Sequence, residues 1–335
     1  MRKKLLDRII ERNKQKETVH QIPVRKTRWL EYAATLLILF TVGAFIFINN
    51  KKPSEKIPDK TAISLTDVPP GSNKAVLTLS NGLTIDLDDA KNGSLGTQGN
   101  SKIIKVAEGQ VSYTNHGARD DVNEYNTMTT PRGGQYRLQL PDGTLVWLNA
   151  ASSITFPVSF SNDTRRVSIT GEAYFEVARD ISKPFIVAIN DQTEVRVLGT
   201  HFNISSYKDE PLINTTLIEG SIRIIHARSS EILVAGQQAS ISANSKIKII
   251  NDANIEEVLA WKNGFFHFEG TSLEVVMRQL SRWYDTEVIF EGDVPDIELV
   301  GNISRNINAS GVLKMLAFTG VRFRIENKKI IVMSK

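Results

Sequence analysis

The sequence predicts a single transmembrane helix followed by an all-β domain and a small α+β module. Three observations support this fold class: an uncharged apolar run near the N-terminus, alternation of apolar and polar residues with period two after residue 74, and helix-like patterns after residue 258. The all-β domain is expected to be a solenoid-like or sandwich arrangement of stacked hairpins, and the last module to consist of β-α-β repeats. The expected segments are a short cytoplasmic tail (1–28), the transmembrane helix (29–49), a linker (50–73), the all-β domain (74–250) and the α+β module (258–335).

The tail is basic and the rest of the chain is not. Residues 1–28 carry ten Lys or Arg against three acids, whereas the remaining residues carry 31 against 34. A protein that binds DNA or RNA needs its cations on the folded part, so this distribution argues against direct nucleic-acid binding. The basic tail also favours a cytoplasmic N-terminus, which leaves the C-terminus outside the cytoplasmic membrane.

The apolar run at 32–48 contains no charged residue, and with residues 29–31 it reaches the length of about 20 residues that spans a bilayer. It is longer than the apolar part of a typical signal peptide, and no small-residue cleavage motif follows it. We therefore expect a retained anchor rather than a cleaved leader. The linker that follows is rich in Pro, Lys and small polar residues, and we interpret it as solvated.

The all-β domain contains an internal near-repeat. The segment LTLSNGLTIDL at 77–87 resembles LQLPDGTLVWL at 138–148. Both are strand–turn–strand units in which Asn81-Gly82 and Asp142-Gly143 supply residues that tolerate a positive φ in a hairpin turn. Two copies favour stacked hairpins but are too few for a full solenoid.

Two helices are expected in the last module, at 273–284 and 309–318, each between strands. Thr271 and Glu274 have capping-box spacing at the start of the first helix, and Asn308 is placed to cap the second. Together with the flanking strands this pattern predicts two β-α-β units.

The residues show little sign of catalytic chemistry. The chain has no cysteine, and its five histidines never occur at metal-ligand spacing, so we expect no metal and no cofactor. Glu172 and Glu176 share one face of a strand and could in principle act as a glycosidase pair. A strand with one solvated face also places Glu outward by default, and we favour that interpretation. The chain is therefore expected to bind or signal rather than to act as an enzyme.

Several long blocks resemble a known family. Residues 130–157 and 171–207 look like the periplasmic domain of FecR-type anti-sigma regulators. Residues 261–292 are similar to the C-terminal module of the Bacteroidetes branch, which itself resembles the short N-terminal domains of secretins and TonB-dependent transducers. The resemblance covers about residues 74–335.

This resemblance implies a single-pass inner-membrane protein with its C-terminus in the periplasm. Its cytoplasmic tail would hold an extracytoplasmic-function sigma factor, and its periplasmic part would contact the signalling domain of an outer-membrane TonB-dependent transducer. The tail departs from the family pattern of several helices, because 28 residues suffice for one short amphipathic helix, which could also lie on anionic lipid. The competing interpretation is an anchored carbohydrate-binding or structural envelope protein with an exposed aromatic platform and no sigma-factor partner.

Some members of this family cleave themselves at a Gly-Thr bond, and Gly199-Thr200 lies in a similar setting. The Thr200 hydroxyl would attack the preceding carbonyl, and His201 could assist proton transfer. Alternatively, Gly199 forms a bulge between two strands and Thr200 is an ordinary strand residue, which is the interpretation we favour.

Overall fold

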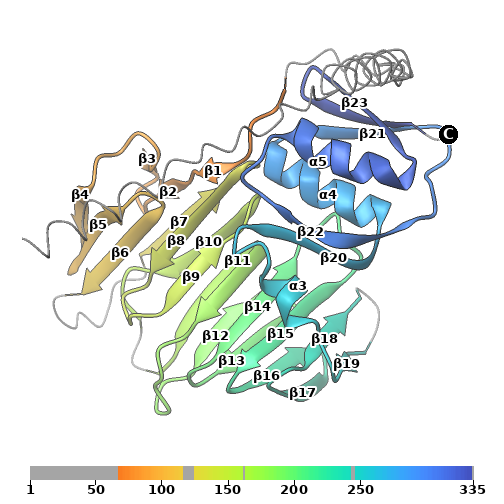
Figure 1. Ribbon diagram of the computed structural model, residues 1–335. Helices are drawn as coiled ribbons and strands as arrows, with labels where there is room; N and C mark the ends of the chain where they lie inside the picture. The colour runs from red at the N-terminus through yellow and green to blue at the C-terminus, as the bar shows by residue number, and fades with distance from the viewer. Residues whose placement is uncertain (1–66, 116–123, 161–162, 243–245, 334–335) are drawn as a thin grey trace, which may run out of the picture. The chain divides into compact units, whose positions relative to one another are not determined.

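The computed structural model describes residues 67–115, 124–160, 163–242 and 246–333, all of which belong to one compact unit (Figure 1). The predicted cytoplasmic tail, the predicted transmembrane helix and most of the predicted linker lie outside these residues. Within the described ranges, no helix is long and apolar enough to cross a membrane. The described part is mostly β-sheet with a small α+β region at its C-terminal end, as the sequence predicted.

The all-β domain is built from two sheets that share one long strand. Neighbours across the first sheet, in order, are β3 (Thr84–Asp86), β2 (Val76–Thr78), β7 (Tyr125–Thr130), β10 (Ser152–Pro157), β11 (Arg165–Glu176), β12 (Phe185–Ala188), β13 (Thr193–Val197), β16 (Ser221–His226) and β17 (Ser229–Val234). Neighbours across the second sheet are β4 (Gly93–Gln98), β5 (Ser101–Ala107), β6 (Gln110–Asn115), β8 (Gly134–Gln139), β9 (Leu145–Leu148), β11 again, β14 (His201–Ser206), β15 (Ile213–Glu219), β18 (Gln238–Ile241) and β19 (Lys248–Ile250). The short β1 (Ser72–Asn73) pairs in parallel with β8.

Strand β11 passes from the first sheet to the second at Gly171. Its first half pairs with β10 and β12, and its second half pairs with β9 and β14. Gly171 has a φ of 77°, and a Cβ at this position would lie 2.7 Å from the carbonyl oxygen of Ala151. Glycine is therefore required here both for the backbone angle and for the close approach.

The core of the all-β domain lies between the inner faces of the two sheets. The ring of Phe175 on the second sheet meets that of Phe185 on the first, with 6.2 Å between their centroids, and Tyr113 meets Phe156 at 5.0 Å in the same way. Residues that alternate along each strand fill this layer, as period-two patterning requires. Of the two arrangements expected from the sequence, the structure is closer to a sandwich.

The near-repeat of the sequence forms two equivalent hairpins, β2–β3 and β8–β9. In each, the glycine has a positive φ, 83° at Gly82 and 87° at Gly143, and its N–H donates to the carbonyl of the residue three positions before it. The side chains of Asn81 and Asp142 accept from the amide two residues later. Both loops therefore have three residues with a glycine in the left-handed conformation, a common hairpin type.

The C-terminal module (residues 265–333) follows the predicted chain order of β-α-β repeats. Its elements are β20 (Phe265–Ser272), α4 (Leu273–Tyr284), β21 (Glu287–Glu291), β22 (Glu298–Ser304), α5 (Ala309–Leu316), the 3₁₀ turn η1 (Ala317–Thr319), β23 (Arg322–Glu326) and β24 (Lys329–Met333). The two strands of each repeat belong to different sheets, since β20 pairs with β22 while β21 pairs with β24, which pairs with β23. A connecting segment (residues 251–264) with the short helix α3 (Ile255–Leu259) joins the module to the all-β domain.

The helix caps differ from the sequence prediction. Helix α4 begins after Ser272, and the hydroxyl of Thr271 donates instead to Glu257 of the connecting segment. Asn308 precedes α5 as predicted, but its side chain does not cap the helix. Instead the carboxylate of Asp67, from the other end of the described chain, accepts from the Ser310 amide. Local spacing identified where the helices begin, but tertiary contacts decided which side chains satisfy their first N–H groups.

The end of the predicted linker is only partly solvated: Pro69, Ser72 and Asn73 are exposed, but Val68 is not. Val68 is 7% exposed and belongs to the core of the C-terminal module, and its carbonyl oxygen accepts from the Ala309 amide. The Ser72 amide donates to the carbonyl of Gly133. The prediction is therefore wrong for Val68, because the segment, although rich in proline and polar residues, finds backbone partners on two sides of the fold.

Candidate functional site

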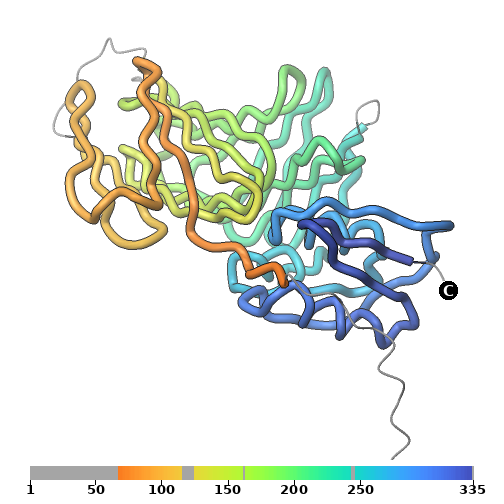
Figure 2. Tube along the Cα trace, turned by 90° about the horizontal axis from the view of Figure 1, so that it is seen from above, coloured from red at the N-terminus to blue at the C-terminus, as the bar shows by residue number. Residues whose placement is uncertain are grey.

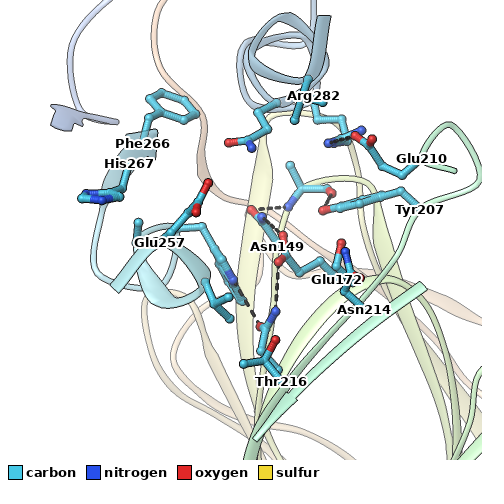
Figure 3. Close-up of a pocket in the computed structure, with 18 of the residues that line it drawn as sticks. Asn149, Glu172, Tyr207, Glu210, Asn214, Thr216, Glu257, Phe266, His267 and Arg282 are labelled. Atoms are coloured by element: carbon cyan, nitrogen blue, oxygen red, sulfur yellow. Dashed lines mark hydrogen bonds and ion pairs between the residues drawn. The ribbon is translucent and has the colours of Figure 1, made fainter. Parts of the chain in front are cut away.

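A cavity of about 400 Å³ lies where the all-β domain meets the connecting segment and the C-terminal module (Figure 3). One wall carries the polar side chains of Glu172 from β11, Asn203 from β14 and Asn149, which directly follows β9. The facing wall carries Glu257 from α3 and His267 from β20. The cavity is therefore built from three parts of the chain that are far apart in sequence.

A chain of hydrogen bonds joins the all-β domain to the connecting segment and to the C-terminal module. Arg305 Nη2 donates to Asn149 Oδ1 over 2.9 Å, and Asn149 Nδ2 donates to Glu172 Oε2 over 2.7 Å. The other oxygen of this carboxylate, Oε1, accepts from Asn203 Nδ2 over 3.0 Å. The amide oxygen of Asn203 in turn accepts from the indole N–H of Trp261 over 3.3 Å. Glu172 is thus the central acceptor of a network that reaches from the all-β domain to the C-terminal module.

Burial raises the pKa of Glu172. The two asparagine amides, followed by the charges of Arg282 and Arg305, stabilise the carboxylate and oppose that shift. Because both oxygens accept amide hydrogens, the side chain has a fixed orientation and acts as a structural acceptor.

Arg305 is the buried cation of this network. It is 3% exposed, its guanidinium lies 3.8 Å from the centroid of the Trp283 ring, and Nη1 donates to the Trp261 carbonyl over 3.0 Å. Burial lowers the pKa of Arg305 to about 10, so the group remains a cation at neutral pH. Cation–π contact and charge-assisted hydrogen bonds together compensate part of the cost of removing the guanidinium from water.

Helix α4 is fastened to the loop after β14 by a second set of charges. Arg282 donates to Asp209 over 2.8 Å and to Glu210 over 2.9 Å, and its guanidinium lies 4.0 Å from the centroid of the Tyr207 ring. Arg278 forms a two-pronged pair with the same Glu210, at 3.1 and 2.8 Å. The planar arginine fork suits this carboxylate geometry. The two arginines therefore hold one face of α4 against the all-β domain.

The opposite wall has polar groups with fewer partners. Glu257 accepts from the Thr271 hydroxyl, and burial raises the pKa of its carboxyl, a shift that the nearby His267 opposes. Nδ1 of His267 is buried and makes no hydrogen bond to any residue that the structure describes.

The structure separates the two carboxylates that the sequence placed on one face of a strand. Glu172 lines the cavity, whereas Glu176 lies 3.8 Å from Nζ of Lys262. Glu172 does lie on the outer face of the second sheet, as the favoured interpretation expected, because Ala173 and Phe175 on the opposite face fill the core. It is half-buried rather than solvated, because the connecting segment and the C-terminal module cover that part of the sheet. The two carboxylates make separate contacts, and nothing in their arrangement favours a glycosidase pair.

Gly199 and Thr200 lie just before β14, beside a register irregularity at His201. Gly199 has a φ of 152°, and a Cβ there would lie 2.7 Å from the Cα of Arg179. Thr200 is 3% exposed, and its hydroxyl donates to the Ser221 carbonyl over 3.2 Å. Nδ1 of His201 lies 3.2 Å from a carboxylate oxygen of Glu219. This geometry gives Gly199 a structural role, and self-cleavage stays an untested prediction.

The competing carbohydrate-binding interpretation predicts an exposed aromatic platform. Trp147 and Tyr174 do pack edge to face, with 5.5 Å between their ring centroids. Nζ of Lys262 lies 4.6 Å from the Trp147 centroid, and the guanidinium of Arg137 lies 4.5 Å from it. Cations therefore cover this aromatic pair where a sugar ring would stack.

Sequence reasoning missed the arginines that define the site. Arg282 adjoins the apolar stripe of α4, and a cation next to a buried face is a signal that it is paired. Arg305 follows β22 and carries no comparable local signal. In the part of the chain that the structure describes, no cluster of His, Asp or Glu could hold a metal ion.

Comparison with known proteins agrees with this two-part architecture. The FecR protein family profile matches residues 126–223, within the all-β domain, and the FecR C-terminal profile matches residues 265–332, the C-terminal module. A 1.65 Å crystal structure of a candidate anti-sigma factor from Parabacteroides distasonis ATCC 8503 is 31% identical to this chain, with a TM-score of 0.58. The similarity covers 99% of that chain and 62% of this one. The chain belongs to the FecR family.

A second crystal structure of a candidate anti-sigma factor from the same organism, at 2.50 Å, is 30% identical, has the same TM-score of 0.58, and covers 63% of this FecR-family chain and 99% of its own. No protein with a curated description matches the chain. The family resemblance stated from the sequence is therefore confirmed. Both family regions contribute to the cavity wall, because Asn149, Glu172 and Asn203 lie in the first and Arg282 and Arg305 in the second.

Proposed function

We propose that this FecR-family chain is a membrane-anchored regulator of a sigma factor that relays a signal from the cell envelope. The observation that carries the proposal is that both family regions occur in one chain and are joined by the buried Arg305–Asn149–Glu172 network. A structure joined in this way can pass a change in the C-terminal module to the all-β domain. The similarity to two candidate anti-sigma factors supports the same assignment.

In this proposal residues 29–49 cross the inner membrane once, with the N-terminus in the cytoplasm and the folded part in the periplasm. The tail, residues 1–28, contacts an extracytoplasmic-function sigma factor. The proposal rests on the uncharged run and on the basic tail of the sequence.

The test is a purification of the full chain from native membranes through a tag after Lys335, followed by mass spectrometry of the proteins that accompany it. We expect a sigma factor, and we expect it to be lost when residues 1–28 are replaced by a neutral sequence of equal length. Recovery of the same sigma factor with the replaced tail would assign the contact elsewhere. A preparation that contains envelope glycan but no sigma factor would favour the competing interpretation.

We further propose that the signalling domain of a TonB-dependent transducer adds to the free edge of β22. This strand pairs with β20 alone among the described residues, and its Val300 side chain is 82% exposed. An unpaired strand edge with an exposed apolar residue is suited to pairing with an extended segment of another chain.

The proposed contact between β22 and the transducer is tested by placing a lysine on β22. Val300→Lys should weaken binding of the transducer signalling domain to the full chain by at least about tenfold, because edge lysines oppose strand addition. Ile232→Lys is the matched control, since Ile232 is 57% exposed on β17, which pairs only with β16 in the described part. Equal affinity of the two variants, measured by calorimetry, would remove β22 from the interface.

A further inference from the structure

The first described residues, 67–73, lie against the C-terminal module before the chain enters the all-β domain (Figure 2). We refer to residues 67–73 as the strap. The strap is the first part of the chain that the structure describes, and its Asp67 contacts Ser310 of α5, more than 240 residues later. The start of the fold and its last module are therefore physically joined.

Asp67 makes the main contact. Its Oδ2 accepts from the Ser310 hydroxyl over 2.8 Å and from the Asn308 amide over 2.9 Å, and its Oδ1 accepts from the Ser310 backbone N–H over 3.1 Å. Helix α5 has no side-chain cap of its own, so this carboxylate satisfies one of its free N–H groups and lies at the positive end of the helix. One charged side chain thus makes three of the hydrogen bonds that hold the strap at the start of α5.

The rest of the strap makes fewer contacts. Val68 is buried in the module, and the Ala309 amide donates to its carbonyl over 2.9 Å. Gly71 passes so close to the ring of Trp283 that a Cβ would lie 2.7 Å from it. Beyond this point the strap is bound by the two-residue pairing of β1 with β8. A segment with one buried side chain and a charge-dependent anchor needs little free energy to open locally, compared with the core strands and helices.

We propose that the strap is a releasable tether controlled from α5: when the contact of Asp67 with Ser310 and Asn308 is lost, residues 67–73 detach locally while both cores stay folded. Detachment would free up to about 25 Å of extended chain, residues 67–73, at the N-terminal end of the described part. This inference concerns the regulation of the fold itself, goes beyond the proposed function and does not depend on the identity of any partner.

The absence of cysteine from the chain allows a direct test. Val68→Cys places a thiol where the side chain is buried, so a maleimide can label it only when the strap opens. Leu77→Cys places a thiol at a fully buried position of the all-β core and reports global unfolding. Labelling rates are measured on the full chain in detergent micelles under native conditions.

Removing the anchor from either end should open the strap. Asp67→Asn and Ser310→Ala should each speed labelling of the Val68→Cys thiol by about tenfold, because each removes hydrogen bonds to a charged group. The Leu77→Cys thiol should stay slow in both backgrounds. Two matched controls should leave the Val68→Cys rate unchanged: Asp180→Asn, whose carboxylate accepts from the amide and hydroxyl of Ser182, and Ser304→Ala, a half-buried serine of the same module.

Three results would overturn the inference: rapid labelling of the Val68→Cys thiol without any second change, no response to Asp67→Asn and Ser310→Ala, or a parallel rise at the Leu77→Cys thiol. If a variant that combines Val68→Cys with Asp67→Asn or Ser310→Ala does not fold, a second measurement that needs no added cysteine is used. Hydrogen exchange of the Ala309 amide, which donates to Val68, should accelerate in Asp67→Asn alone. Unchanged exchange there would equally refute a releasable strap.

Discussion

At the scale of single residues, Arg305 shows how much one buried cation can connect. Its guanidinium meets an asparagine of the all-β domain, a carbonyl of the connecting segment and a tryptophan ring of its own module. Burying an unpaired guanidinium here would cost a large desolvation free energy. The hydrogen bonds to the Asn149 side chain and the Trp261 carbonyl offset part of that cost. Removing the Arg305 side chain should therefore weaken the whole contact between the all-β domain and the C-terminal module.

We predict that Arg305→Ala lowers the free energy of unfolding by about 3–5 kcal/mol, because Asn149 and the Trp261 carbonyl lose their buried partner and a cavity is left beside Trp283.

Arg324→Ala is the control. Arg324 is 40% exposed and pairs with Glu291 and Glu326 at the surface, so we expect a loss of at most about 1 kcal/mol. Urea unfolding followed by circular dichroism measures both, and similar losses in the two variants would contradict a structural role for Arg305.

A second residue-scale prediction concerns the Gly199-Thr200 bond. We expect the purified full chain to stay intact, because the Thr200 hydroxyl is buried and donates to the Ser221 carbonyl, and His201 pairs with Glu219. The measurement is gel electrophoresis with mass spectrometry after prolonged incubation. Two fragments divided after Gly199 that disappear in Thr200→Ala would instead establish self-cleavage by the threonine hydroxyl.

At the scale of elements, the helices and strands of the C-terminal module were predictable because their signals are local. The predicted helix at 273–284 has the bounds of α4, and the second helix differs only in its last turn, which is 3₁₀. The caps were not predictable. Thr271 and Asn308 had suitable spacing, but Glu257 and Asp67 compete for their polar groups from distant parts of the chain. Sequence spacing identifies a candidate cap and says nothing about competing partners.

The strap gives an element-scale prediction for pH. Hydrogen bonds from Asn308, Ser310 and Val68 outweigh partial burial and lower the pKa of Asp67 below its usual value of 3.8. A carboxyl whose pKa is lower in the folded state stabilises the fold above its unfolded pKa, and that stability is lost as pH falls through the lower folded value. The stability difference between wild type and Asp67→Asn should therefore be constant from pH 7 to about 5 and shrink below about pH 4. Chemical denaturation at each pH measures the stability difference, and a difference that does not begin to shrink below about pH 4 would exclude this origin.

At the scale of the whole molecule, the prediction is one of topology. The uncharged run at 32–48 after a basic tail predicts that everything beyond residue 49 lies outside the cytoplasmic membrane. A reporter that is active only in the periplasm, fused after Lys335, should be active, and a cytoplasm-only reporter at the same place should be silent. The reverse result would overturn the orientation and with it the proposed placement of the transducer contact.

Sequence patterns alone predict the all-β character of residues 74–250, the two hairpins with their glycine turns, the element order of the last module and the family. These depend on periodicity and on turn chemistry, which act over a few residues. Sequence patterns do not determine how the parts meet. The tertiary structure alone decided that Glu172 is covered rather than solvated, that Arg305 reaches Asn149 across 156 residues, and that Asp67 reaches Ser310 across 243. The physical reason is that a buried charge or a free helix N–H needs a partner without specifying which one, and only the folded chain brings a particular partner within hydrogen-bonding distance.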